Sequence, residues 1–270
     1  MTSGHAIPQG LHFVAESAVR GLAVAERRVE NPLATVICVH GGLDRGGSFA
    51  RLARRLELFD LIAYDRRGYQ GSRGLGPLGL DYDVEDLLAL ARREVGHSPV
   101  IYFGHSFGGV VALGAALREP SLAQQVIVYE APLPWVRHRE SSRTILSDDP
   151  QYEAEVFFRR MVSNRAWERL SDLEQQSRRL DGPALYSDLA LLRNGATPFD
   201  LSQLEVPTIY AHGDAYHLEY YRALCQDLRE MNPLIDAREL QHVGHGAHLS
   251  HPDLLASLIL STWRERCVLE

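Results

Sequence analysis

The stretch at residues 99–119 limits the possible fold more strongly than any other part of the chain. A short β-prone run at 100–103 leads into the pentapeptide GHSFG at 104–108, and an apolar segment rich in small residues follows directly. This order predicts a buried strand, a tight turn and a helix. Glycine on both sides of the turn removes Cβ atoms that would collide, so Ser106 is expected to lift its hydroxyl group out of the sheet.

A serine at the start of a helix lies beside backbone N–H groups that have no partner within the helix. The N–H of Phe107 is therefore a candidate donor to the oxyanion that forms when Ser106 attacks a carbonyl group. In the alternative interpretation, Ser106 only caps the helix. The strand before it, the helix after it and candidate partners later in the chain favour the catalytic interpretation.

Three further motifs accompany this turn. They are His40-Gly41-Gly42 after one predicted strand, the segment DRRGYQGS at 65–72 after the next, and Gly244-His245 followed by His251-Pro252 near the end of the chain. Together with residues 104–109, these motifs resemble the α/β-hydrolase superfamily in their order and spacing over nearly the whole chain. The resemblance implies an α/β-hydrolase fold, with a mainly parallel eight-stranded sheet, helices on both faces and an inserted helical cap.

Strand-like and helix-like segments alternate along the chain, which favours a parallel sheet because parallel strands need crossover connections. Loose alternation at 11–29 predicts an antiparallel hairpin at the sheet edge. Other strands are expected at 35–39, 58–64, 125–129, 206–212 and 234–240, helices at 47–56, 81–95, 218–230 and 252–266, and a loop at 65–76.

Residues 134–203 show no strand pattern. Polar helical segments are expected there instead, at 150–163, 165–180 and 183–193. We therefore predict a core made of residues 1–133 and 204–270, and a helical cap, or lid, made of residues 134–203 that lies over the carboxyl ends of the strands.

A serine hydroxyl needs a base to remove its proton, and imidazole has a suitable pKa near neutral pH. Among the 12 histidines, His245 follows the last predicted strand at the sheet edge where Ser106 is expected, and it matches the superfamily's catalytic histidine. His242, His248 and His251 are interpreted as polar loop residues or helix caps, and His40 as a structural hydrogen-bonding group. His105 flanks Ser106 but is expected to point away from the bond being cleaved.

The third catalytic group is a carboxylate that orients the imidazole. Superfamily members usually carry it in a Gly-x-x-Asp pattern, but the segment GDAY at 213–216 has Tyr216 at that position. Asp214 lies two residues earlier in the same loop, and Glu130 ends the preceding strand, a place that some members use. We favour Glu130 because its side chain is longer and because a carboxylate at the end of a buried strand needs a partner.

A second oxyanion donor is expected from the loop after the first central strand. By resemblance the backbone N–H of Gly42 supplies it, with Leu43 as the alternative. The arginines of the 65–72 segment are expected to tie loops together rather than to touch substrate.

Composition narrows the possible partners and cofactors. The net charge is −7, the 28 basic side chains are scattered and all are arginine, so nucleic acid, an anionic membrane and lysine Schiff-base chemistry are not expected. Three cysteines without a C-x-x-C pair argue against disulfides and a structural zinc site. Met1 to Gln9 lacks the pattern of a signal peptide, so a cytoplasmic protein is expected. The expected serine mechanism needs no cofactor or metal, and a homo-oligomer is left open.

The sequence therefore predicts a serine hydrolase that cleaves a carboxylic ester of a small molecule, with a lactone or thioester as the next choices. The alternatives are a carbon–carbon bond hydrolase with the same triad and a ligand-binding protein that has lost turnover. Tyr216 at the usual acid position is the observation that favours the last alternative.

Overall fold

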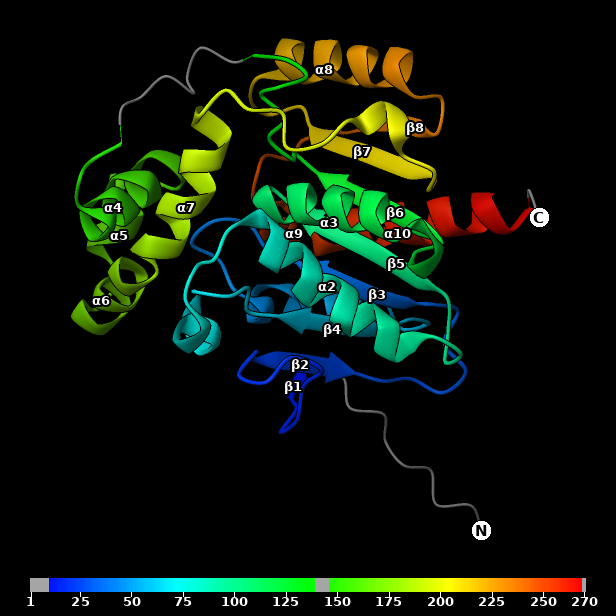
Figure 1. The fold of residues 1–270 in the computed structure, drawn as a ribbon, viewed down its shortest axis with the longest axis horizontal. Coiled ribbons are helices and arrows are strands. Elements are labelled where there is room, and N and C mark those ends of the chain that lie inside the picture. Colours follow the sequence, from blue (N-terminus) through cyan, green and yellow to red (C-terminus); the bar gives the residue numbers. More distant parts are fainter. Residues whose placement is uncertain (1–9, 139–145, 269–270) are drawn as a thin grey trace.

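The computed structural model describes residues 10–138 and 146–268, so the expectation for Met1 to Gln9 lies outside the described residues. The described chain forms an eight-stranded sheet in the order β1-β2-β4-β3-β5-β6-β7-β8 (Figure 1). β2 is antiparallel to β1 and β4, whereas the other neighbouring strands are parallel. This confirms the mainly parallel sheet and the hairpin at its edge. The strands are β1 His12–Phe13, β2 Val24–Arg27, β3 Thr35–Val39, β4 Asp60–Tyr64, β5 Val100–His105, β6 Gln125–Tyr129, β7 Thr208–Gly213 and β8 Ile235–Leu240.

Helices cover both faces of the sheet because successive strand residues point to opposite sides. In β3, Ile37 and Val39 pack into the apolar cluster beneath α2, α3 and α8, whereas Val36 and Cys38 pack into the cluster beneath α1 and α10. Both faces of β3 are therefore buried, which explains its continuous apolar sequence. These helices are α1 Ala50–Ala53, α2 Leu80–Glu94, α3 Phe107–Arg118, α8 Leu218–Met231 and α10 Pro252–Val268.

Several short elements differ from the sequence expectation. The segment expected at 165–180 divides into α5 Asn164–Glu168 and α6 Asp172–Leu180, because Ser171 and Glu174 form a capping box that starts a new helix. The expected loop at 65–76 contains a 3₁₀ turn. The short elements are η1 Gly46–Phe49, η2 Gln70–Leu75, η3 Pro120–Leu122, η5 Leu201–Gln203 and α9 Ala247–Ser250.

Helices α4 to α7 are inserted between β6 and β7 and lie together beyond the carboxyl ends of the parallel strands (Figure 1). The remaining bounds are α4 Pro150–Met161 and α7 Gly182–Arg193. The inserted helices have their own apolar cluster, which includes Phe158, Trp167 and Leu185, and Leu43 of the loop after β3 packs into it. The described residues of 134–203 form no strand of the sheet.

A buried arginine joins the inserted helices to the core. Arg66 is fully buried and hydrogen-bonds to Asp188 of α7 and Asp83 of α2. Its backbone N–H donates to Nε2 of His40 at 2.9 Å, and burial lowers the pKa of His40 to about 3, so this ring is a neutral acceptor. Removing one partner of a buried ion pair leaves the other charge uncompensated, at a cost of about 3–5 kcal/mol. The arginine-rich turn therefore holds loops and α7 in place.

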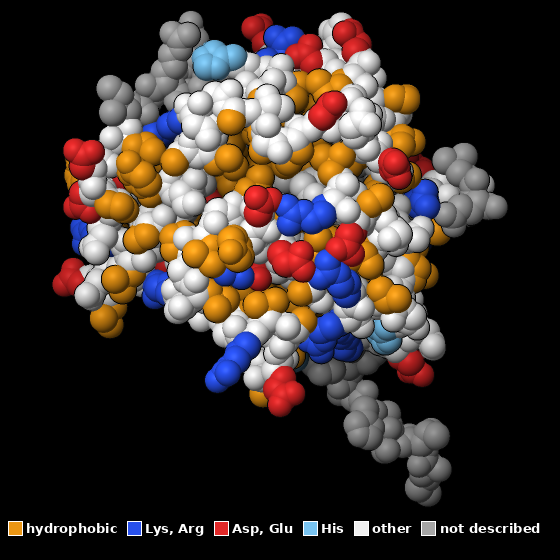
Figure 2. Space-filling view, in the orientation of Figure 1, with side chains coloured by type: hydrophobic (Ala, Val, Ile, Leu, Met, Phe, Trp, Pro, Cys, Tyr) orange, Lys and Arg blue, Asp and Glu red, His pale blue; other side chains and the backbone are white. Residues whose placement is uncertain are grey.

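Acidic and basic side chains are interspersed on the face seen in Figure 2. On α2 and α3, Arg92 pairs with Glu85 and Glu119, and Arg118 pairs with Asp81. Among the described helices, none combines the length and apolar character that crossing a membrane would require.

Candidate active site

Ser106 occupies the tight turn between β5 and α3. Its backbone angles are φ 53° and ψ −127°, a strained conformation for a residue with a side chain, and it is the N-cap residue of α3. Gly108 makes this turn possible, because a Cβ atom there would lie 2.0 Å from the carbonyl oxygen of Val39. The turn is therefore pressed against the end of β3, with the strained serine at the carboxyl edge of the sheet.

The loop after β3 lies directly beside Ser106. A Cβ atom added at Gly41 would lie 2.8 Å from Cβ of Ser106, so only glycine fits there without a shift. The next residue is Gly42, and the residue after Ser106 is Phe107, which begins α3. Gly42 and Phe107, the two candidate oxyanion donors, therefore directly follow the two residues that are in contact, Gly41 and Ser106.

His245 and Glu130 are in direct contact. Nδ1 of His245 lies 2.7 Å from Oε2 of Glu130, and Glu130 is 5% exposed at the end of β6. The backbone N–H of Gly213 donates to Oε1 at 3.0 Å, and the hydroxyl of Tyr221 donates to Oε2 at 3.2 Å. These donors hold the carboxylate in one orientation, so the imidazole that it contacts is also held in one orientation.

Asp214 points elsewhere. Its Oδ1 accepts the backbone N–H of His242 at 2.7 Å, and the described structure has no hydrogen bond between Asp214 and His245. Tyr216, at the position where the superfamily usually carries its acid, is 69% exposed. Of the two carboxylates considered from the sequence, Glu130 is the one that geometry places on the candidate base.

His105, the residue before the candidate nucleophile, connects the two candidate catalytic loops. Nε2 of His105 lies 2.8 Å from the backbone oxygen of His245, and the two rings have centroids 4.7 Å apart. This contact places the His245 backbone beside the residue that precedes Ser106. In the described chain the Ser106 hydroxyl makes no direct hydrogen bond to the His245 ring. In enzymes without bound substrate, the hydrogen bond between nucleophile and base is often long and shortens only when substrate binds.

One residue of this region has no signal in the sequence. His248 is interpreted there as a polar loop residue, but it lies on α9 with 2% exposure, and its Nε2 is 3.0 Å from Oδ2 of Asp44. The two residues are 204 positions apart in the chain, so no local spacing connects them.

Comparison with known proteins places this geometry in a family. A model of the alpha/beta hydrolase family matches residues 36–258, which include every candidate catalytic residue. The chain belongs to the alpha/beta hydrolase family. Its sheet and helix layers are the α/β-hydrolase fold.

Curated relatives of the chain include one named as a lipase and one named as a methyl ester esterase, and the chain spans less than half the length of the first of these. Lipase LipV of Mycobacterium tuberculosis is 33% identical over 97 residues, which cover 36% of this chain and only 37% of that protein. Pimeloyl-[acyl-carrier protein] methyl ester esterase of Stenotrophomonas maltophilia is 27% identical over 242 residues, covering 83% of this chain and 90% of the relative. Among solved structures, the thioesterase domain from the curacin biosynthetic pathway has a TM-score of 0.62 at 20% identity, covering 95% of this chain and 100% of that one.

Proposed function

We propose that this α/β-hydrolase is a serine hydrolase that cleaves a carboxylic ester of a small molecule through an acyl-serine intermediate. The observation that carries the proposal is the 2.7 Å contact between His245 and the buried Glu130, beside the strained turn of Ser106. The names of the relatives, a lipase and a methyl ester esterase, support an ester as the substrate class.

The proposed reaction has two halves. Ser106 attacks the ester carbonyl while His245 takes its proton, and the N–H groups of Gly42 and Phe107 donate to the oxyanion. His245 then gives the proton to the departing alcohol, which leaves an acyl-serine. Water attacks this ester with His245 again as base, releasing the carboxylic acid and restoring Ser106. Glu130 holds the imidazole and stabilises its charged form throughout.

The contact with Glu130 also bears on the ligand-binding alternative. That alternative drew its support from Tyr216, which stands at the superfamily's usual acid position. A buried carboxylate on Nδ1 of His245 supplies the same chemical function from a neighbouring strand end. A lactone or thioester undergoes the same two steps as an ester, so both stay within the proposed substrate class.

The purified chain is expected to hydrolyse p-nitrophenyl acetate and to react with a fluorophosphonate probe, since an activated serine is nucleophilic towards both. A burst of p-nitrophenol in rapid-mixing measurements would report the acyl-enzyme. Peptide mass analysis should place the phosphonate on Ser106, and Ser106→Ala should take up none. Labelling of another residue, or no turnover across acyl chains from acetate to octanoate, would contradict the proposal.

We also propose that residues 134–203 form a lid over the site. The supporting contact is at the oxyanion loop, because a Cβ atom added at Gly42 would lie 2.8 Å from Cδ1 of Leu185 and 3.7 Å from Cζ of Phe157. Side chains of α7 and α4 thus cover the loop that is proposed to bind the oxyanion. Such a cover shapes the acyl pocket and excludes water.

Leu185→Ala is expected to shift the ester preference towards longer acyl chains, because it removes apolar volume directly above Gly42. The ratio of kcat/KM for octanoate to that for acetate should rise by about 10-fold or more. Leu189→Ala is the matched control, since it changes the same helix and the same apolar cluster. Identical chain-length profiles for the two variants would argue against the lid.

A further inference from the structure

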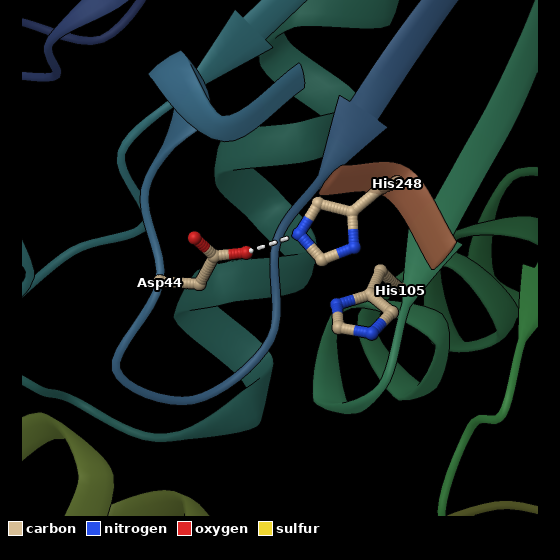
Figure 3. Close-up of side chains that lie close together, drawn as sticks. All are labelled: Asp44, His105 and His248. Atoms are coloured by element: carbon tan, nitrogen blue, oxygen red, sulfur yellow. Dashed lines mark hydrogen bonds and ion pairs between the residues drawn. The ribbon is translucent and has the colours of Figure 1, made fainter. Parts of the chain in front are cut away.

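A second cluster of ligating side chains lies beside the candidate active site. Figure 3 shows Asp44, His105 and His248 converging from the loop after β3, the end of β5 and α9. One ligand atom from each residue lies within 4.8 Å of the other two, and both histidines are buried. The proposed catalytic reaction uses none of these three side chains as a reacting group.

The hydrogen bonds define the state of His105. Its Nε2 faces the carbonyl oxygen of His245 at 2.8 Å, and a carbonyl only accepts, so Nε2 carries the proton. With the proton on Nε2, Nδ1 of this tautomer holds a lone pair. That atom is buried and has no hydrogen-bond partner within the described residues. A buried acceptor without a donor is unfavourable, which points to a missing electrophilic partner.

Asp44 supplies negative charge to the same place. Its Oδ2 lies 3.0 Å from Nε2 of His248. Its other described hydrogen bond comes from the neutral hydroxyl of Ser48 at 3.1 Å. The carboxylate thus lies beside two imidazoles, and among the described residues no arginine hydrogen-bonds to it.

A second cluster of two carboxylates and a histidine differs from this one in having an arginine bound to it. Asp60, Glu94 and His97 also lie within ligand distance of one another. There, however, the guanidinium group of Arg28 donates to Asp60 at 3.1 Å and to Glu94 at 2.7 Å. Arginine already provides the positive charge at that cluster, whereas no arginine within the described residues hydrogen-bonds to Asp44 in the cluster beside the active site.

We propose that Asp44, His105 and His248 bind a divalent transition metal ion of the zinc type. Two imidazoles and one carboxylate form a ligand set that zinc accepts, with a fourth position for water. Nδ1 of His105 and a carboxylate oxygen of Asp44 are ligands as they stand. Nε2 of His248 becomes a ligand when its proton moves to Nδ1 of the same ring, which has no partner in the described chain to oppose that change.

The ion would have a structural task. Its ligands come from the loop that carries Gly42, from the residue before Ser106 and from the helix that follows His245. The carbonyl of His245 already orients the His105 ring through Nε2, as expected for the outer partner of a metal-bound histidine. Metal binding would therefore tie together the three loops of the active site. No local pattern in the sequence indicates this site, because Asp44 and His248 are 204 positions apart in the chain.

The test uses the full chain without an affinity tag, stripped with a chelator and titrated with zinc alone. Calorimetry is expected to find one equivalent bound, and the melting temperature should rise by several degrees, since an ion that binds only the folded state stabilises it. Cobalt in place of zinc should give the intense visible bands of four-coordinate Co²⁺. Asp44→Asn and His248→Gln should each weaken binding by at least about 100-fold.

His97→Gln is the matched control, because it removes a carboxylate-paired histidine from the cluster that Arg28 neutralises. It is expected to bind zinc as the natural chain does. Zinc affinity that survives in both Asp44→Asn and His248→Gln would overturn the proposal, as would a natural chain that binds less than one equivalent. Should either variant fail to fold, the stoichiometry and cobalt spectrum of the natural chain decide, and a spectrum typical of six-coordinate Co²⁺ would count against this site.

Discussion

Ser106→Ala and His245→Ala are each expected to reduce kcat/KM for ester hydrolysis by at least about 10⁴-fold. The serine hydroxyl forms the covalent intermediate, and the imidazole carries the proton in both halves of the reaction. Because nucleophile and base act as a unit, the double variant should be little worse than either single variant. Steady-state kinetics on p-nitrophenyl acetate measure kcat/KM for the two single variants and the double variant. The enzyme concentration in each assay is corrected for the fraction of protein that is folded.

Two substitutions outside the site control for general damage. Ser202→Ala changes an exposed serine of η5, and His251→Ala changes an exposed histidine near α9. Both are expected to keep kcat/KM within a few-fold of the natural chain. Substantial turnover by Ser106→Ala, or losses that multiply in the double variant, would exclude the serine mechanism proposed here.

Glu130→Gln is expected to lower kcat by up to about 10⁴-fold, the size of the effect known when trypsin-like enzymes lose the charge of their orienting carboxylate. Glutamine keeps the size of the side chain and one acceptor oxygen, which can still accept from Gly213, but it puts an NH2 group in place of the oxygen that faces Tyr221 and His245 and removes the negative charge next to Nδ1 of His245. The imidazole then lacks both the fixed tautomer and the counter-charge for its protonated form. Measurements of kcat and KM on the same ester report this loss.

Asp214→Asn is the matched comparison, since it makes the same chemical change in the carboxylate that geometry leaves on His242. Its kcat is expected to stay within a few-fold of the natural value. Thermal unfolding of both variants separates a rate effect from a folding effect. If Asp214→Asn has the larger kinetic defect while Glu130→Gln loses mainly stability, then Asp214 is the acid and the interpretation of the 2.7 Å contact is wrong.

The features that the sequence determined are local ones. The strand, turn and helix around Ser106 follow from contiguous residues, because glycine, apolar residues and serine each limit the backbone at their own positions. The alternation of strands and helices likewise reflects periodicity within each segment. The capping box that starts α6 at Ser171 is also a local signal, although the prediction of a single helix at 165–180 did not use it. Such features need no knowledge of what lies opposite.

Tertiary structure alone decided which distant side chains meet. Glu130 and Asp214 both follow strands at the same sheet edge, and only the fold shows that Glu130 contacts His245 across 115 positions. Arg66 reaches Asp188 across 122 positions, and His248 reaches Asp44 across 204. Parallel strands bring remote loops to one edge, but the direction of each side chain there depends on backbone angles and packing that no local pattern encodes.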